Sequence, residues 1–125
     1  MKISVSIDVP DLEAGTTFYV SALGCTRLRA QGKDMVVLSA GNADIYLMQR
    51  SVASNPASAA SADLERTYER HWTPVHLDFL TDDVDGSVAR IVLAGGVHEG
   101  GEEGDWGAIA HCSDPFGNGF CVIRE

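Results

Sequence analysis

Hydrophobic and polar residues alternate in two similar stretches, one near the N-terminus and one in the second half of the chain. The first begins at Ser4 and the second at His76, and in each the apolar side chains recur at every second position. This period of two is typical of a β-strand with one buried and one open face. Each stretch leads into an aspartate and then into apolar residues at helical spacing, so a strand followed by a helix is predicted in both places.

The ends of the two predicted helices are also marked. Asp11 is expected to cap the first helix, and Gly24 to stop it in a left-handed conformation. Either Asp82 or Asp83 is expected to cap the second helix, which the pair Gly95-Gly96 would end. A shift of 72 residues superimposes strand, cap and glycine stop: Ser4 on His76, Asp11 on Asp83 and Gly24 on Gly96. This agreement predicts a duplicated unit.

Short strands separated by turn residues are expected after each helix. They are predicted at 26–30, 35–40 and 43–50 in the first half, and at 97–99, 106–112 and 119–124 in the second. The prediction is an α+β fold of two β-α-β-β-β modules, covering residues 2–50 and 74–125. Residues 51–73 would link the two modules. The Ser- and Ala-rich part, 51–62, is predicted to be a mobile linker. Residues 63–72 would form either a short helix or a solvated connector, and the connector is preferred.

Length, charge and cysteine content narrow the function. A chain of 125 residues with a net charge of −9 is expected to form one domain that binds neither nucleic acid nor anionic membranes. The acidity favours cationic or neutral small molecules, or serves only to keep the domain soluble. Three scattered cysteines without a CxxC pair suit a reducing compartment. Without a signal-peptide pattern or a membrane-length apolar run, a cytoplasmic location is expected.

Two motifs resemble one known superfamily. The turn Asp114-Pro115-Phe116-Gly117-Asn118 before a last strand, and Val9-Pro10-Asp11-Leu12-Glu13 before the first helix, are similar to motifs of the vicinal-oxygen-chelate superfamily. This superfamily contains glyoxalases, bleomycin-resistance proteins and extradiol dioxygenases. The resemblance implies two βαβββ modules that form a curved mixed sheet around a cleft, usually in a homodimer. The cleft lies within one chain in some members and across two chains, with exchanged strands, in others.

The resemblance also implies where a divalent metal would bind. The four ligand positions of the family's metalloenzymes, one on the first and one on the last strand of each module, fall on Ser4, Tyr46, His76 and Cys121. Only His76 keeps a ligand type usual there, because the last-strand positions of the family's enzymes hold glutamate. No metal cofactor is therefore expected, and His76 and Cys121 are weak candidate ligands. Asp78, on the same strand face as His76, could complete a different set.

Seven residues are predicted to line the cleft and contact a ligand: Ser4, Ser6, Tyr46, His76, Asp78, Trp106 and Cys121. A few polar groups converging in an apolar pocket are typical of a small-molecule site. Trp106 precedes the closing strands as in bleomycin-resistance proteins, and would either stack on a flat ligand or pack internally. Trp72 would line the cleft mouth or fix the linker. His76 alone is a candidate catalytic residue.

We therefore predict a homodimer that binds or sequesters a small organic molecule, possibly an antibiotic, without a metal, as bleomycin-resistance proteins do. The alternative is a divalent-metal-dependent glyoxalase-like lyase, isomerase or dioxygenase. A third reading is a regulatory or structural dimer whose cleft is filled by its own side chains.

Overall fold

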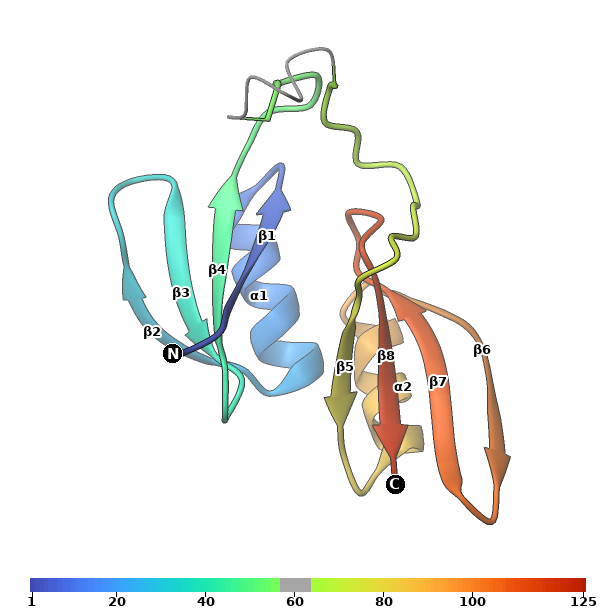
Figure 1. The fold of residues 1–125 in the computed structure, drawn as a ribbon. Coiled ribbons are helices and arrows are strands. Elements are labelled where there is room, and N and C mark those ends of the chain that lie inside the picture. The colour runs from blue at the N-terminus through green and yellow to red at the C-terminus, as the bar shows by residue number, and fades with distance from the viewer. Residues whose placement is uncertain (57–63) are drawn as a thin grey trace. The chain divides into compact units, whose positions relative to one another are not determined.

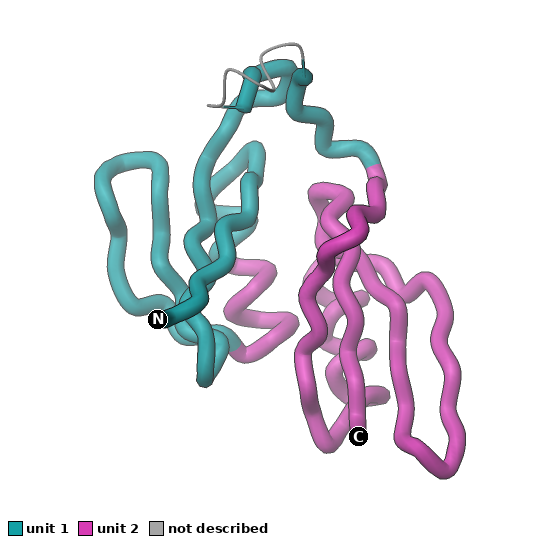
Figure 2. The backbone as a smooth tube through the Cα atoms, in the orientation of Figure 1, with its two compact units in different colours: residues 1–16, 25–69 teal, residues 17–24, 70–125 magenta. Residues whose placement is uncertain are grey.

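Two four-stranded sheets, each with its own helix in the chain order, make up the fold (Figure 1). The computed structural model describes residues 1–56 and 64–125. The chain divides into two compact units, residues 1–16 with 25–69 and residues 17–24 with 70–125 (Figure 2). No helix within the described ranges has the length and apolar character needed to span a membrane.

The first half contains β1 (Ser4–Val9), α1 (Leu12–Leu23), β2 (Thr26–Ala30), β3 (Met35–Ser39) and β4 (Asp44–Gln49). Its sheet has the order β1-β4-β3-β2, with β1 parallel to β4 and the other pairs antiparallel. The second half contains β5 (Leu77–Leu80), α2 (Val84–Leu93), β6 (Val97–Gly104), β7 (Gly107–Ser113) and β8 (Gly119–Arg124). Its order, β5-β8-β7-β6, repeats the same pattern of one parallel and two antiparallel pairs. The predicted α+β class with two βαβββ modules is confirmed.

Capping contacts confirm where the helices start. Asp11 accepts a hydrogen bond from the Ala14 backbone N–H at 2.8 Å. Asp83, rather than Asp82, caps α2, because its Oδ1 accepts from the Gly86 N–H at 2.8 Å. Gly24 has the expected left-handed conformation, with φ of +67°. In the second half the left-handed residue is Gly95 (φ +94°), one position before the residue aligned with Gly24, because α2 is shorter than α1.

One predicted strand is much longer in the structure. Residues 97–99 were expected to be a short strand before glycine-rich turns, whereas β6 extends over Val97–Gly104. Its glycines lie within the ladder that pairs β6 with β7, and an irregularity between His98 and Gly100 absorbs one extra residue. Glycine is uncommon in strands, so composition pointed to a turn, but pairing with β7 satisfies its backbone groups.

Alternation along the strands places one set of side chains in each core. In the first unit Val9, Leu38, Ile45 and Leu47 lie on the same sheet face and are fully buried. The second unit is built around aromatic rings: Phe120 contacts Phe79 at 5.5 Å and Phe18 at 6.4 Å between ring centroids. Phe18 comes from the second part of α1, which explains why residues 17–24 group with the second unit.

The Asp-Pro-x-Gly-Asn turn is held by one buried carboxylate. Asp114 is 2% exposed and accepts hydrogen bonds from the backbone N–H groups of Phe116 and Asn118, each at 2.9 Å. It also accepts from the Asn118 side-chain amide at 2.8 Å and from the Tyr19 hydroxyl at 2.9 Å. Four donors compensate the burial of its charge. The motif therefore fixes the β7–β8 connection and ties α1 to it.

Within the connector, residues 51–56 and 64–69 belong to the first unit. The Arg66 guanidinium pairs with Asp8 at 2.5 Å, and the Tyr68 hydroxyl donates to the Arg50 carbonyl at 2.6 Å. Residues 64–72 contain no helix, so the short-helix alternative for this segment is wrong over these residues. The prediction of a mobile linker at 51–62 falls partly on 57–62, which lie outside the described residues.

Candidate functional site

Strand register places three chemically active side chains in one row of the second sheet. Asp78 of β5 pairs with Cys121 of β8, and Cys121 pairs with His111 of β7. Residues paired across neighbouring strands project from the same face, so the three side chains are neighbours. The residues next to them in sequence, Phe120, Val122 and Cys112, are buried on the opposite face. We call the face that carries Asp78, Cys121 and His111 the open face of the second sheet.

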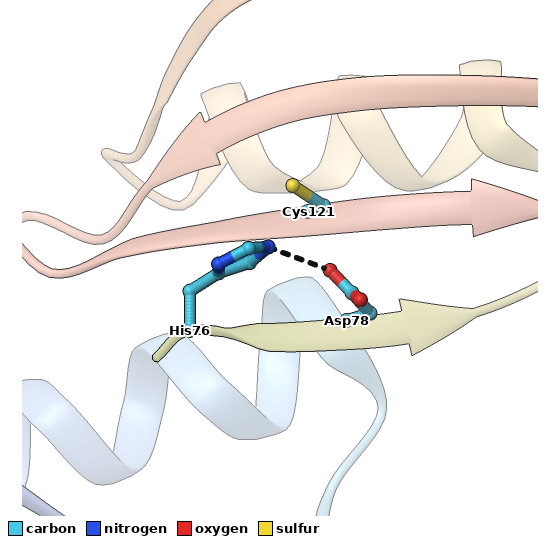
Figure 3. A group of neighbouring side chains, drawn as sticks. All are labelled: His76, Asp78 and Cys121. Atoms are coloured by element: carbon cyan, nitrogen blue, oxygen red, sulfur yellow. Dashed lines mark ion pairs between the residues drawn. The ribbon is translucent and has the colours of Figure 1, made fainter. Parts of the chain in front are cut away.

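His76 joins this row from the residue just before β5. Its Nε2 lies 3.2 Å from Oδ1 of Asp78, and Figure 3 shows the two side chains facing each other beside Cys121. One ligand-type atom each from His76, Asp78 and Cys121 lie within 4.8 Å of one another. On the other side of the thiol, Nδ1 of His111 is 3.4 Å from the Cys121 Sγ. Two imidazoles, a carboxylate and a thiol are thus brought together.

An aromatic side chain covers one end of this group. The Trp72 ring lies 4.6 Å from the His76 ring between centroids, and the Arg70 guanidinium carbon lies 5.3 Å from the Trp72 ring centroid. Arg70 also pairs with both carboxylate oxygens of Glu99 on β6. Gly119 is required beneath the indole, because a Cβ there would be 2.4 Å from a Trp72 ring carbon. The tryptophan is therefore held over the sheet while half of its surface remains exposed.

Burial controls the protonation of the central thiol. Desolvation raises the pKa of Cys121 to about 11, and the charge and hydrogen bond of Asp78 act in the same direction. Without a further cation, the side chain is a neutral thiol at physiological pH and a poor nucleophile. By contrast, hydrogen bonding to Arg70 lowers the pKa of Glu99, which keeps that ion pair charged.

The predicted residues of the first module also share one sheet face. Ser6 pairs with Tyr46, and Ser4 pairs with Asp44, across β1 and β4. The Tyr46 hydroxyl accepts a 3.4 Å hydrogen bond from Arg29 on β2. These are neutral hydroxyl groups with one nearby guanidinium, so this face can donate and accept hydrogen bonds but offers few good metal ligands.

Each predicted residue can now be placed. Ser4, Ser6 and Tyr46 lie together on the first sheet, and His76, Asp78 and Cys121 lie together on the second. Trp106 lies just before Gly107 at the tip of the β6–β7 hairpin, where it is 56% exposed. Its stacking on a flat ligand stays a prediction. A depression of about 290 Å³ lies elsewhere on the second unit, between α2 and β6–β7, and contains none of the predicted residues.

Sequence reasoning missed His111 and the contact of Trp72 with His76. The signal for His111 was present: the Asp114–Asn118 turn pairs Ser113 with Gly119, and each step outward along the hairpin then pairs one residue of β7 with one of β8. Two steps out, this pairing joins His111 to Cys121. No local pattern indicates the position of Trp72, because it depends on a segment outside the sheet folding back over Gly119.

The residues at the family's metal positions do not match a glutamate-containing centre. Ser4 and Tyr46 offer neutral hydroxyl groups, and Cys121 offers a thiol at the place of a carboxylate. Of these four positions, only His76 and Cys121 offer a nitrogen or sulfur donor, and both lie in the second unit. No catalytic step through the family's metal follows from these residues.

Comparisons with known proteins agree with this architecture. A model of the glyoxalase-like domain family matches residues 4–123. A glyoxalase/bleomycin resistance protein from Streptomyces sp. CB03234 is 26% identical, with a TM-score of 0.66 and coverage of 98% of this chain and 99% of that one. The fosfomycin resistance protein FosX from Mesorhizobium loti is 17% identical, with a TM-score of 0.72 and coverage of 100% and 92%. A hypothetical protein from S. aureus is 19% identical, with a TM-score of 0.74 and coverage of 100% and 97%.

No curated protein matches the chain. Two βαβββ modules with an open-faced sheet in each define a protein of the vicinal-oxygen-chelate class. Within that superfamily, the chain belongs to the glyoxalase-like domain family.

Proposed function

We propose that this protein binds and sequesters a small organic molecule without needing a metal ion, in the manner of bleomycin-resistance proteins. The observation that carries the proposal is the exposed group of Trp72, His76 and Asp78 on the second unit. It combines a partly exposed indole stacked on an imidazole with a carboxylate that is 43% exposed. An indole beside a carboxylate suits a planar molecule that carries a positive charge.

Charge supports the same ligand class. The chain has a net charge of −9, so a cation approaches it more readily than an anion does. The positive charge of Arg70 is paired with Glu99. Asp78, beside His76, is therefore the negatively charged side chain that a cationic ligand would contact. We also propose that the hydroxyl groups of Ser4, Ser6 and Tyr46 on the first sheet supply hydrogen bonds to the ligand. We further propose a cytoplasmic homodimer as the working form.

The test is titration with planar cationic compounds in the presence of EDTA. The chain has two tryptophans, so the Trp106→Phe variant reports on Trp72 alone by fluorescence. Saturable quenching that weakens at least about tenfold in Asp78→Asn, through loss of a charged contact, supports the proposal. Asp82→Asn is the matched control, because it removes an equal charge from outside the site. Absence of quenching across bleomycin-type glycopeptides and smaller aromatic cations would contradict it.

A second candidate is a metal-dependent glyoxalase-like lyase, isomerase or dioxygenase. The observation that favours it is the proximity of His76, Asp78 and Cys121. Fosfomycin resistance proteins share this fold, and one of them has been solved in complex with Mn(II). Turnover of a thiohemiacetal, a catechol or fosfomycin after addition of divalent metal, abolished by His76→Ala, would move the assignment to an enzyme.

A further inference from the structure

We propose that the groove between α2 and the β6–β7 hairpin is a second ligand site, which takes a free linear aliphatic amine in its protonated form. The groove has a volume of about 290 Å³ and contains none of Trp72, His76 and Asp78. The proposal therefore does not depend on the binding of a planar molecule at the open face. Small-molecule sites begin at roughly 300 Å³, so a short ligand is expected.

The groove is hollow because small residues lie at the outer edge of the second sheet. β6 is an edge strand (Figure 1), and its Gly101 pairs with Ala110 of β7, which pairs with Val122 of β8. Along this row the side chains become smaller toward the edge, and Ala110 and Val122 are buried on the face opposite the open face. A side chain at position 101 is excluded, because its Cβ would collide with the Ile109 carbonyl oxygen. The close approach of β6 and β7 thus keeps this space empty of side chains.

One wall of the groove is aliphatic and comes from α2. Val84 and Val88 are one helical turn apart, so their side chains lie on the same side of the helix. Val84 is buried, whereas Val88 keeps part of its surface open to solvent. The methyl groups of Ala108 and Ala110 continue this surface, and no aromatic ring is among the described residues that line the groove. The wall suits a methylene chain, whereas an aromatic ligand has no ring to stack on.

The rim of the groove is acidic. Asp85 contributes from α2 and Glu102 and Glu103 from β6, while His98 is the other titratable residue of the lining. Arg124 donates to Glu103 at 3.0 Å. Within the described part of the chain, no cationic side chain pairs with Asp85 or Glu102. An aliphatic chain that ends in an ammonium group matches both features, with its methylene groups on the valines and its charge at the rim.

The experiment uses n-pentylamine as the probe, titrated into the full chain at low ionic strength and followed by calorimetry and amide NMR shifts. We expect saturable binding at one site, with the largest shifts at Gly101, Ala108 and Ala110. n-Pentanol has the chain without the charge and should bind more weakly. Methylamine has the charge without most of the chain and should bind at least about tenfold more weakly, because each buried methylene changes affinity roughly fourfold.

Two pairs of variants locate the site. Asp85→Asn/Glu102→Gln should weaken pentylamine binding at least about threefold, through loss of two exposed charged contacts. Asp82→Asn/Glu13→Gln is the matched control, because it removes an equal charge from outside the groove. Val88→Phe should fill the groove and reduce binding at least about tenfold, since the methylene chain loses its place on the wall. Ala89→Phe, at the next position of α2 and outside the lining, should leave binding unchanged.

Three results would overturn the proposal: pentylamine that does not saturate, pentanol that binds as tightly, or equal effects of Val88→Phe and Ala89→Phe. The peptide acetyl-Gly-Lys-Gly-amide tests a protein partner, because a lysine side chain carries the same chemistry. Tighter binding of this peptide than of pentylamine would overturn the assignment to a free amine. Pentylamine should not change Trp72 fluorescence in Trp106→Phe, so failure of this site and failure of the planar-cation site are separate results.

Discussion

At the scale of single residues, the second sheet places a neutral thiol between a carboxylate and an imidazole. The Cys121 thiol keeps its proton because burial and the negative charge of Asp78 both oppose ionisation.

The thiol provides a pH-dependent prediction. The double variant Cys25→Ser/Cys112→Ser leaves Cys121 as the thiol to be followed. Its pKa is raised to about 11, so its alkylation in EDTA should be slow at neutral pH and become faster as the pH approaches 11. Asp78→Asn removes a negative charge that disfavours the thiolate, so the pH–rate profile should shift to lower pH. An unchanged profile in Asp78→Asn would show that Asp78 does not influence the thiol.

A second residue-scale prediction concerns the buried carboxylate of the closing turn. Tyr19→Phe removes one of the four donors to Asp114 and should lower the free energy of unfolding by about 1–2 kcal/mol, measured with urea. Tyr46→Phe is the control, because that hydroxyl makes only a long contact at the surface. Its effect should stay within about 0.5 kcal/mol. Equal effects of the two substitutions would contradict the assigned role of Tyr19.

At the scale of elements, capping contacts and hairpin register position the site. Each helix begins with an aspartate whose side chain accepts a backbone N–H three residues later. The β7–β8 register follows from the turn held by Asp114 and decides that His111 lies beside Cys121. A one-residue slip in that hairpin would turn His111 to the opposite face and separate the group.

The start of α2 provides a prediction with a close control. Asp83→Ala should lower the free energy of unfolding by about 1 kcal/mol, because the Gly86 N–H loses its acceptor. Asp82→Ala should change it by less than about 0.5 kcal/mol, since Asp82 does not cap the helix. Urea unfolding of both variants measures the difference. A larger loss for Asp82→Ala would mean that the cap is assigned to the wrong residue.

The 70–76 segment provides the other element-scale prediction. Gly119→Ala places a methyl group where the Trp72 ring lies, so the indole must move away from His76. We expect a change in Trp72 fluorescence in a Trp106→Phe background and a loss of about 1–3 kcal/mol in stability. The same protein should bind planar cations more weakly. Unaltered fluorescence would mean that the indole does not rest on Gly119.

At the scale of the whole molecule, the chain is a duplicated βαβββ protein of the glyoxalase-like family. Each unit has its own core and its own open sheet face. We predict a homodimer, so light scattering should give a mass near twice 13.3 kDa, independent of added metal. A mass of 13.3 kDa at micromolar concentrations would contradict the dimer.

The sequence by itself determined the duplicated architecture, the Asp11 cap and the closing turn, whereas the structure chose Asp83 over Asp82 as the second cap. These features depend on local periodicity, on side chains that hydrogen-bond to nearby backbone groups, and on a repeat that a shift of 72 residues reveals. Its prediction was wrong for the extent of β6, because pairing with β7 overrides the low strand propensity of glycine.

Only the tertiary structure showed which further side chains join His76, Asp78 and Cys121. The row of Asp78, Cys121 and His111 depends on pairing between three strands, and the contact of Trp72 with His76 depends on a segment folding back over Gly119. Residues up to 43 positions apart along the chain, such as Asp78 and Cys121, come together through backbone hydrogen bonds between strands. These hydrogen bonds depend on how whole strands pair, which the composition and spacing of single residues do not reveal.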